Sequence, residues 1–234
     1  MIYFNHLPLA EDILQALAEL QIEYVFQPIF YPDGKTVYAR EALMRPHGRT
    51  VVDLIEEYTR LEKLHVLEVA TFFGATQAYL MRGYTEKISI NSFPCEAFSK
   101  REAEAFRNYY GVQDSILIVE LLEYPEFSLP MSLAKREHAS HGNSLIALDD
   151  YGSGFNDIEK VDLLNPEIIK IDRSLLTDVD MDTDKQQRIK NIIDRMHSYG
   201  IKVVAEGVET KGEFDCLIGL GADFFQGYYL ARPA

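Results

Sequence analysis

The length and composition of the chain are those of one barrel of alternating strands and helices. It has 234 residues, of which 47% are hydrophobic and 12% aromatic, and such barrels often contain about 200–250 residues in one domain. The formal net charge of −14 argues against polymeric nucleic acid as a partner, because binding to many phosphates needs a basic surface. A small phosphate ester remains a possible ligand, because a metal ion can hold it inside an acidic protein.

The cysteines and the hydrophobic runs predict a soluble protein of the reducing cytoplasm. Cys95 and Cys216 are far apart and have neither the spacing of a disulfide framework nor that of a zinc site. The first residues lack the regions of a signal peptide, and no uncharged run approaches the ~18 residues that span a membrane.

Short runs of β-branched, aromatic and aliphatic residues predict eight strands along the chain. Most are apolar on both faces, as expected of parallel strands that are covered by helices outside and by packed side chains inside. Residues 31–35 are typical of a tight turn, so the first two strands are predicted to form an antiparallel hairpin. The predicted strands are Tyr24–Phe30, Thr36–Met44, Lys87–Asn91, Ile116–Leu121, Ser144–Asp149, Ile168–Ile171, Lys202–Ala205 and Asp223–Gln226.

Segments with helical spacing of apolar residues fill the gaps between the strands. The predicted helices are Leu9–Leu20, Val51–Leu61, Leu64–Met81, Lys100–Tyr109, Ser128–His141, Lys185–Tyr199 and Lys211–Leu220. The acidic run Asp178–Asp184 is interpreted as a solvated loop. No linker divides the chain, so residues 1–234 are expected to form one domain, with residues 1–20 as a leading segment and helix. The predicted fold class is α/β, a (β/α)8 TIM-like barrel with one antiparallel strand.

Polar side chains lie at or near the carboxyl ends of nearly all these strands, where the active sites of parallel barrels gather. They are Glu41, Asn91, Glu120, Asp149, Asp150, Lys170, Glu206 and Gln226. Any one of them alone is more often a helix cap or a surface ion pair. Closure of a barrel brings the strand ends to one mouth, where clustered carboxylates repel one another unless cations neutralise them. The sequence therefore predicts a bound metal.

The candidate ligands are oxygen atoms, which favours Mg²⁺ or Mn²⁺ over zinc or copper. No histidine ends a predicted strand. His65 and Glu68 have the i, i+3 spacing of one helix face, and we interpret that face as outer and solvated. Histidines 138, 141 and 197 fall in predicted helices or at helix ends and are interpreted in the same way.

Asp149 and Asp150 are adjacent, and adjacent side chains of a strand point to opposite faces. Both can serve one site only if the chain turns there, and Gly152 and Gly154 permit such a turn. We therefore interpret residues 149–154 as a loop that carries two ligands, although Gly-x-Gly spacing alone is a weak signal.

Two basic residues have two interpretations each. Lys170 shares a strand face with Asp172 and would steady a nucleophilic water or a phosphate oxygen, or else form a structural ion pair in the core. Arg45, four residues after Glu41, would form a fork to a phosphate at the mouth, or else be an ordinary surface arginine.

Fragments that cover almost the whole chain, in this order and at these spacings, resemble the EAL-domain family of bacterial cyclic di-GMP phosphodiesterases. They are Gln27-Pro28-Ile29, Glu41-Ala42-Leu43-Met44-Arg45, Ile90-Asn91, Glu120-Leu121-Leu122-Glu123, Asp149-Asp150-Tyr151-Gly152-Ser153-Gly154, Lys170-Ile171-Asp172, Ala205-Glu206-Gly207-Val208-Glu209-Thr210 and Gln226-Gly227-Tyr228.

The resemblance implies two Mg²⁺ or Mn²⁺ ions, hydrolysis of cyclic di-GMP to linear pGpG, and a homodimer. Lys170 and Glu206 would position and deprotonate the attacking water, with Gln226 lining the same site. Gln27 and Arg45 would contact the substrate, and Glu123 would anchor the loop after the fifth strand. The implied metal ligands are Glu41, Asn91, Glu120, Asp149 and Asp150.

Two other functions stay open. A degenerate receptor of the same fold would bind the dinucleotide or a protein partner without cleaving it, although the retained candidate ligands favour the enzyme. A different metal-dependent barrel, such as an enolising lyase, would also gather carboxylates at its strand ends. The chain is expected to be a stand-alone enzyme or an excised domain.

Overall fold

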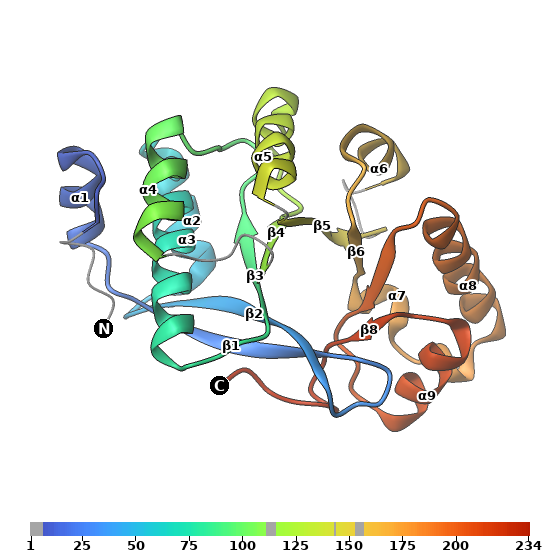
Figure 1. Cartoon of the computed structure of the whole chain (residues 1–234). Coiled ribbons are helices and arrows are strands. Elements are labelled where there is room, and N and C mark those ends of the chain that lie inside the picture. Colours follow the sequence, from blue (N-terminus) through green and yellow to red (C-terminus); the bar gives the residue numbers. More distant parts are fainter. Residues whose placement is uncertain (1–6, 111–115, 143, 153–156) are drawn as a thin grey trace.

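Within the described residues, eight strands close into a barrel in chain order, with β1 beside β8 (Figure 1). The structure is a computed structural model that describes residues 7–110, 116–142, 144–152 and 157–234. The strands are β1 (Ile22–Phe30), β2 (Val37–Pro46), β3 (Lys87–Ser92), β4 (Leu117–Leu121), β5 (Leu145–Tyr151), β6 (Ile168–Ile171), β7 (Lys202–Ala205) and β8 (Phe224–Phe225). The predicted barrel is confirmed.

Strand β1 is antiparallel to both β2 and β8, whereas all other neighbouring strands are parallel. The turn between β1 and β2 is held by the carboxylate of Asp33, which accepts hydrogen bonds from the backbone of Lys35 (2.9 Å) and Thr36 (2.8 Å). Gly34 has a φ of +64°, a left-handed conformation that glycine adopts without steric cost. The predicted hairpin and the single antiparallel strand are therefore confirmed.

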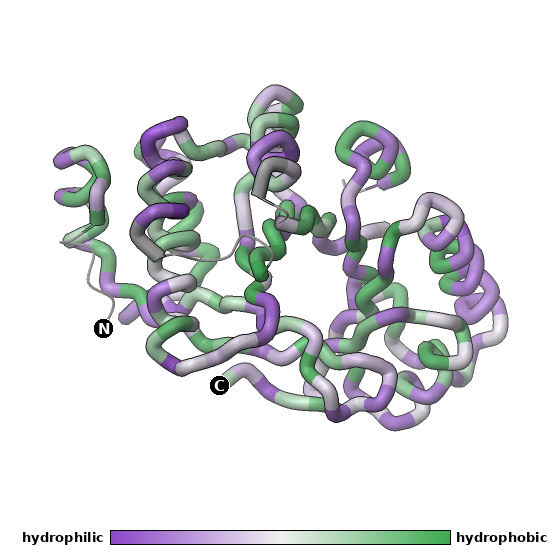
Figure 2. The backbone as a smooth tube through the Cα atoms, viewed as in Figure 1, coloured by the Kyte–Doolittle hydropathy of each residue, from purple (hydrophilic) through white to green (hydrophobic). Residues whose placement is uncertain are grey.

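Helices cover the outside of the barrel. Helix α3 packs on β1, β2 and β3 and is covered in turn by α1, α2 and α4, which explains why most of its residues are buried. Figure 2 shows hydrophilic residues along the outer side of α8, which packs on β7. None of the described helices is both long and apolar enough to cross a membrane. The helices are α1 (Glu11–Ala18), α2 (Val51–Arg60), α3 (Leu64–Met81), α4 (Lys100–Tyr110), α5 (Leu129–Gly142), α6 (Ile158–Leu164), α7 (Arg173–Leu176), α8 (Thr183–Ser198) and α9 (Lys211–Leu220).

Capping residues fix where the helices begin. Thr50 and Asp53 form a reciprocal capping box at the start of α2, and Thr210 and Glu213 form one at the start of α9. In each box two side chains satisfy backbone N–H groups that have no partner within the helix. Both boxes end loops that leave the carboxyl ends of strands, so they also set the length of those loops.

The barrel interior has an apolar layer and, directly above it, a polar layer. The apolar layer consists of Ile29, Ala39, Ile118, Ala147, Ile168, Val204 and Phe224. Side chains two residues apart on a strand point to the same face. The next inward positions toward the carboxyl end of the barrel are therefore Gln27, Glu41, Glu120, Asp149, Lys170, Glu206 and Gln226. The packed apolar layer lies directly beneath these polar side chains and keeps water away from them on that side.

Two predictions of local structure were incomplete. Helix α6 was not predicted; it contains seven residues and begins at the cap of Asp157. Helix α7, four residues long and capped by Asp172, was also missed. Both helices are too short for their spacing of apolar residues to stand out from a loop.

Two interpretations of exposed segments were wrong. The acidic run 178–184 is not simply a solvated loop, because Val179 is fully buried in a short 3-10 helix, η2 (Val179–Met181), and Asp182 caps α8. His65 and Glu68 do not face solvent: Glu68 is 1% exposed and His65 is half-buried. Both contact segments that follow β3, since those segments cover this face of α3.

Candidate active site

The polar layer brings together side chains that are far apart in the sequence. Gln27 comes from β1, Glu41 from β2, Asn91 from β3, Glu120 from β4, Asp149 and Asp150 from β5, Lys170 from β6, and Glu206 and Gln226 directly follow β7 and β8. Every residue that the sequence predicted as a metal ligand or as catalytic lies at or beside this layer. These positions agree with the prediction, whereas the individual roles stay predictions.

Lys170 lies in the middle of the carboxylates. Its Nζ is 2.6 Å from a carboxylate oxygen of Glu206 and 3.1 Å from one of Asp149. It also forms an ion pair with Glu120 and lies 3.7 Å from Glu41. Lys170 is 3% exposed and Glu120 is fully buried, so these charges interact where water screens them poorly.

The carboxylates outweigh the ammonium in this layer. Burial would lower the pKa of Lys170, but the surrounding carboxylates, Asp149 first, raise it well above its ordinary value. Burial, together with neighbouring negative charges, raises the pKa of Glu120 and that of Glu206 well above the usual range even though Lys170 opposes the shift. Burial and the charges of Asp149 and Asp172 raise the pKa of Asp150 to about 6. The layer thus holds more negative charge than Lys170 neutralises.

Amide side chains hold Glu41 at both of its oxygen atoms. Asn91 Nδ2 donates to Glu41 Oε1 (3.1 Å), and Gln226 Nε2 donates to Glu41 Oε2 (2.6 Å). Gln27 is tied to the same group, because its Oε1 lies 3.3 Å from Gln226 Nε2. A Cβ atom on Gly227 would lie 2.0 Å from the carbonyl oxygen of Val208. Only glycine therefore fits directly after Gln226. The carboxylate of Glu41 is therefore fixed in direction.

Asp149 and Asp150 reach the same side of the barrel by a route that differs from the predicted one. Both lie within β5, and the β5–β6 register shifts between Leu148 and Tyr151. Asp150 itself has a φ of +48°, a left-handed conformation that aspartate tolerates better than most residues. The chain thus already departs from a regular strand at Asp150, and Gly152, with a φ of +89°, continues the turn. Gly154 lies outside the described residues.

A family model described as the EAL domain matches residues 10–233. The chain belongs to the EAL domain family. This assignment agrees with the resemblance inferred from the ordered fragments of the sequence.

One relative of this EAL domain is named as a phosphodiesterase. PdeG of Escherichia coli K12, named a probable cyclic di-GMP phosphodiesterase, is 30% identical over 247 residues, which cover 99% of this chain and 48% of PdeG. The chain thus spans about half the length of that relative.

Two solved structures show the same fold. A standalone EAL protein of Vibrio cholerae O395 in its c-di-GMP-bound form has a TM-score of 0.82 and 24% identity, covering 92% of this chain and 93% of that one. BlrP1 of Klebsiella pneumoniae, solved as a manganese and cyclic di-GMP complex, has a TM-score of 0.74 and 20% identity, covering 99% and 63%.

Two overlapping groups of carboxylates in this EAL domain have the spacing of cation ligands. Glu41, Glu120 and Glu206 form one group, and Asp149, Asp150 and Glu206 form the other, with one oxygen atom of each residue within 4.8 Å of the others in its group. Glu206 belongs to both groups, which agrees with its place among the strand-end acids that predicted a metal, whereas the family resemblance implied only that it deprotonates water. All of these donors are oxygen atoms, which suits Mg²⁺ or Mn²⁺.

Two pockets open beside Glu41. One, of about 300 Å³, is lined by residues that include Gln27, Glu206 and Tyr228. The other, of about 280 Å³, is lined by residues that include Asn91 and Arg45. Glu41 lines both pockets, so both open onto the group of carboxylates.

Two further residues that the sequence predicted, Arg45 and Glu123, lie near the mouth. Arg45 is exposed, and its Nη1 donates to the carbonyl oxygen of Met44 (2.8 Å). Glu123 is half-buried and near enough for its charge to contribute to the raised pKa of Asp150. The loop that Glu123 was predicted to anchor includes residues 153–156, which lie outside the described residues.

One buried contributor was missed. Ser89 Oγ donates to Glu120 Oε2 (2.6 Å), and Ser89 is 1% exposed. It lies two residues before Asn91 and therefore on the same strand face. This period-2 rule was a sufficient signal, so the serine belonged among the candidates.

Proposed function

We propose that this EAL domain hydrolyses cyclic di-GMP to linear pGpG, using two Mg²⁺ or Mn²⁺ ions. The family assignment, the name of PdeG as a probable cyclic di-GMP phosphodiesterase and the cyclic di-GMP bound in the solved neighbours support the substrate. The carboxylate-rich layer supports the metal dependence. A cytoplasmic homodimer stays a prediction.

The described residues fit two divalent ions. Four carboxylates surround the single ammonium of Lys170, and hard cations bind such oxygen donors. Gln226 Oε1 is buried and has no hydrogen-bond partner among the described residues. We assign Glu41, Asn91, Glu120, Asp149 and Asp150 as the residues that would hold the ions, with Glu206 as a further donor.

The chain's own side chains would orient the reaction. Bound ions would neutralise the phosphodiester and lower the pKa of a water molecule. Lys170 holds Glu206 and Asp149 at fixed distances and would thereby help to steady the attacking water. Glu206 would accept the proton of that water as its oxygen attacks phosphorus and the bond to the 3′ oxygen breaks.

The shape of the mouth suits a ligand with two similar halves. A cyclic dinucleotide has two bases on either side of its phosphodiester ring. The pockets of about 300 and 280 Å³ share Glu41 as a lining residue. Arg45 and Gln27 line different pockets, which supports their roles as substrate contacts in separate halves.

The observation that carries the proposal is the set of carboxylates around Lys170, and one experiment tests it. Purified protein is incubated with cyclic di-GMP and Mn²⁺, and pGpG is measured by chromatography. We expect turnover by the wild type, its loss in Glu41→Gln, and no loss in Glu104→Gln, an exposed acid on α4. Tight binding of cyclic di-GMP without pGpG would instead identify a receptor and contradict the proposal.

A further inference from the structure

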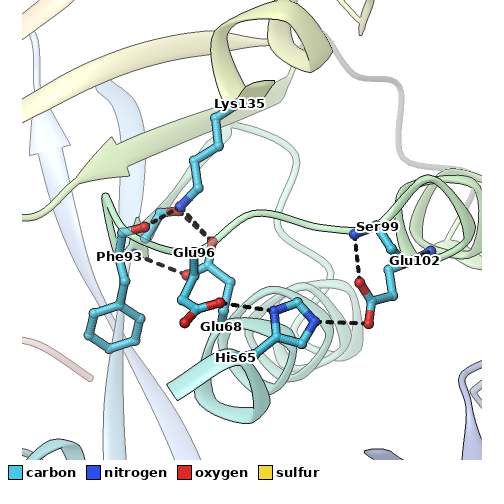
Figure 3. Close-up of polar contacts among 8 residues, drawn as sticks. His65, Glu68, Phe93, Glu96, Ser99, Glu102 and Lys135 are labelled. Carbon is cyan, nitrogen blue, oxygen red and sulfur yellow. Dashed lines mark hydrogen bonds and ion pairs between the residues drawn. The ribbon is translucent and has the colours of Figure 1, made fainter. Parts of the chain in front are cut away.

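A second buried charge network lies on the outer side of the barrel, at the end of β3. Glu68 of α3 and Lys135 of α5 are 1% and 7% exposed and form an ion pair of 2.8 Å (Figure 3). Glu68 Oε1 also accepts a hydrogen bond from Ser92 Oγ (2.7 Å), and Glu68 Oε2 accepts one from the backbone N–H of Phe93 (3.0 Å). Lys135 Nζ donates to Ser92 Oγ and to the carbonyl oxygen of Phe93.

The hydrogen bonds of this pair are directed at the strand end. Both charged groups contact Ser92 and the backbone of Phe93, so they clamp the last residue of β3 and the residue after it. Ser92 is fully buried, and its carbonyl oxygen also accepts a hydrogen bond from the backbone of Leu122. A pair that served only to join α3 to α5 would not need these contacts.

Asn91 is the residue immediately before this clamp. Neighbouring side chains of a strand point to opposite faces, so Ser92 points outward to Glu68 while Asn91 points inward to Glu41. Fixing the backbone at residues 92 and 93 therefore fixes the direction of the Asn91 amide. Partners behind a ligand that hold it in place in this way tune metal sites strongly.

The same segment is tied down again further along. His65 lies one turn before Glu68 on α3, and its ring nitrogens contact the carboxylates of Glu96 (3.2 Å) and Glu102 (3.0 Å) (Figure 3). Ser132 of α5 donates to the carbonyl oxygen of Pro94 (3.0 Å). The segment after β3 thus has little freedom to move Asn91.

We infer that Glu68 and Lys135 are positioning residues that hold Asn91 against Glu41 and so complete the metal site; this rests on the proposed function. The pair acts through the strand end and does not touch the substrate. Its removal should weaken metal binding while the barrel stays folded.

The test replaces both charges together, because one charge left alone in the core would destabilise the fold. In Glu68→Gln/Lys135→Met the side chains keep similar volumes. The matched control is Arg136→Met, since Arg136 is the neighbour of Lys135 on α5 but pairs with Glu167, just before β6, at the opposite end of the barrel. Binding of Mn²⁺ is measured from the electron paramagnetic resonance signal of free Mn²⁺, with circular dichroism as the check of folding.

We expect the double variant to bind Mn²⁺ about ten- to hundredfold more weakly and Arg136→Met to bind it like the wild type. In an Asn91→Ala background, the double replacement should add no further loss, because its effect passes through Asn91. If the double variant does not fold, Ser92→Ala, which removes the two hydrogen bonds of Ser92 Oγ and keeps the ion pair, should show a smaller loss in the same direction.

Unchanged Mn²⁺ affinity in a folded variant, or additive losses with Asn91→Ala, would overturn the inference. Since binding is measured without turnover, a wild type that binds Mn²⁺ but releases no pGpG would refute only the proposed function. A wild type that binds no Mn²⁺ would overturn both.

Discussion

Two buried lysines of this EAL domain have opposite surroundings. Lys135, 7% exposed, neutralises Glu68, and its other donors are used by a serine hydroxyl and a backbone carbonyl. Lys170, 3% exposed, lies among the carboxylates of Glu41, Glu120, Asp149 and Glu206. One environment is balanced in charge, and the other has an excess of negative charge.

This difference in charge balance indicates a structural role for Lys135 and a chemical role for Lys170. A balanced, hydrogen-bonded pair is what a buried charge needs in order to be tolerated in the core. A group of carboxylates with raised pKa values is costly unless cations bind there, and such groups are common at functional sites. We therefore propose that the same residue type positions a strand end at one place and takes part in the chemistry at the other.

The largest expected effect comes from removing the lysine of the acidic layer. Lys170→Met should reduce the rate of pGpG formation by about 10²–10⁴-fold, since a residue that positions or transfers a proton contributes on that scale. Rates are measured at saturating Mn²⁺, beside Lys211→Met, an exposed lysine at the start of α9. If Lys170→Met were as fast as the control, Lys170 would have no role in catalysis and would only form structural ion pairs.

Removing the other lysine should chiefly affect stability. Lys135→Met leaves the carboxylate of Glu68 buried without its cation, and loss of one partner of a buried pair costs about 3–5 kcal/mol. Urea unfolding would show this loss, and the double variant Glu68→Gln/Lys135→Met should lose less. Equal losses in the single and double variants would mean that Lys135 does not neutralise Glu68.

Replacing His65, which lies one turn before Glu68 and is partly exposed, should have the smallest effect on stability, and that effect should depend on pH. Hydrogen bonds to Glu102 and Glu96 raise the pKa of His65 to about 10, from about 6.5 in the unfolded chain. Protonated His65 therefore stabilises the fold fully below about pH 6.5, and this contribution is lost as the pH rises through about 10. Because the side chain is 33% exposed, we expect only about 1 kcal/mol.

The measurement is the difference in the free energy of unfolding between wild type and His65→Gln, taken at several pH values across this window. The difference should shrink as the pH rises, while other titrating groups cancel between the two proteins. A difference that is constant across the window would show that His65 is not charged in the folded protein.

Much of the fold could be predicted because strands and helices alternate with clear periods. Helix α3 and strands β6 and β7 begin and end at the predicted residues. The position of the site followed from the polar residues at or near the carboxyl ends of the strands. The rule that side chains two residues apart share a face, as in Ile168 and Lys170, agrees with that position. Ser89 obeys the same rule and was overlooked.

Features that depend on contacts between distant segments could not be predicted. Glu68 and Lys135 are 67 residues apart, and no local pattern shows that α5 would place an ammonium beside α3. The left-handed conformation of Asp150 overrides the alternation that governs a regular strand, so the turn was assigned to the glycines. Helix α6, with seven residues, has too few turns for its period to be seen.

The central claim is that the acidic layer around Lys170 binds two divalent cations, and the number of Mn²⁺ ions bound per chain tests it most directly. Equilibrium titration of the wild type should show two ions, and Glu41→Gln should bind fewer or bind them more weakly. A wild-type protein that binds no Mn²⁺, or whose Mn²⁺ is unaffected by Glu41→Gln, would contradict the account.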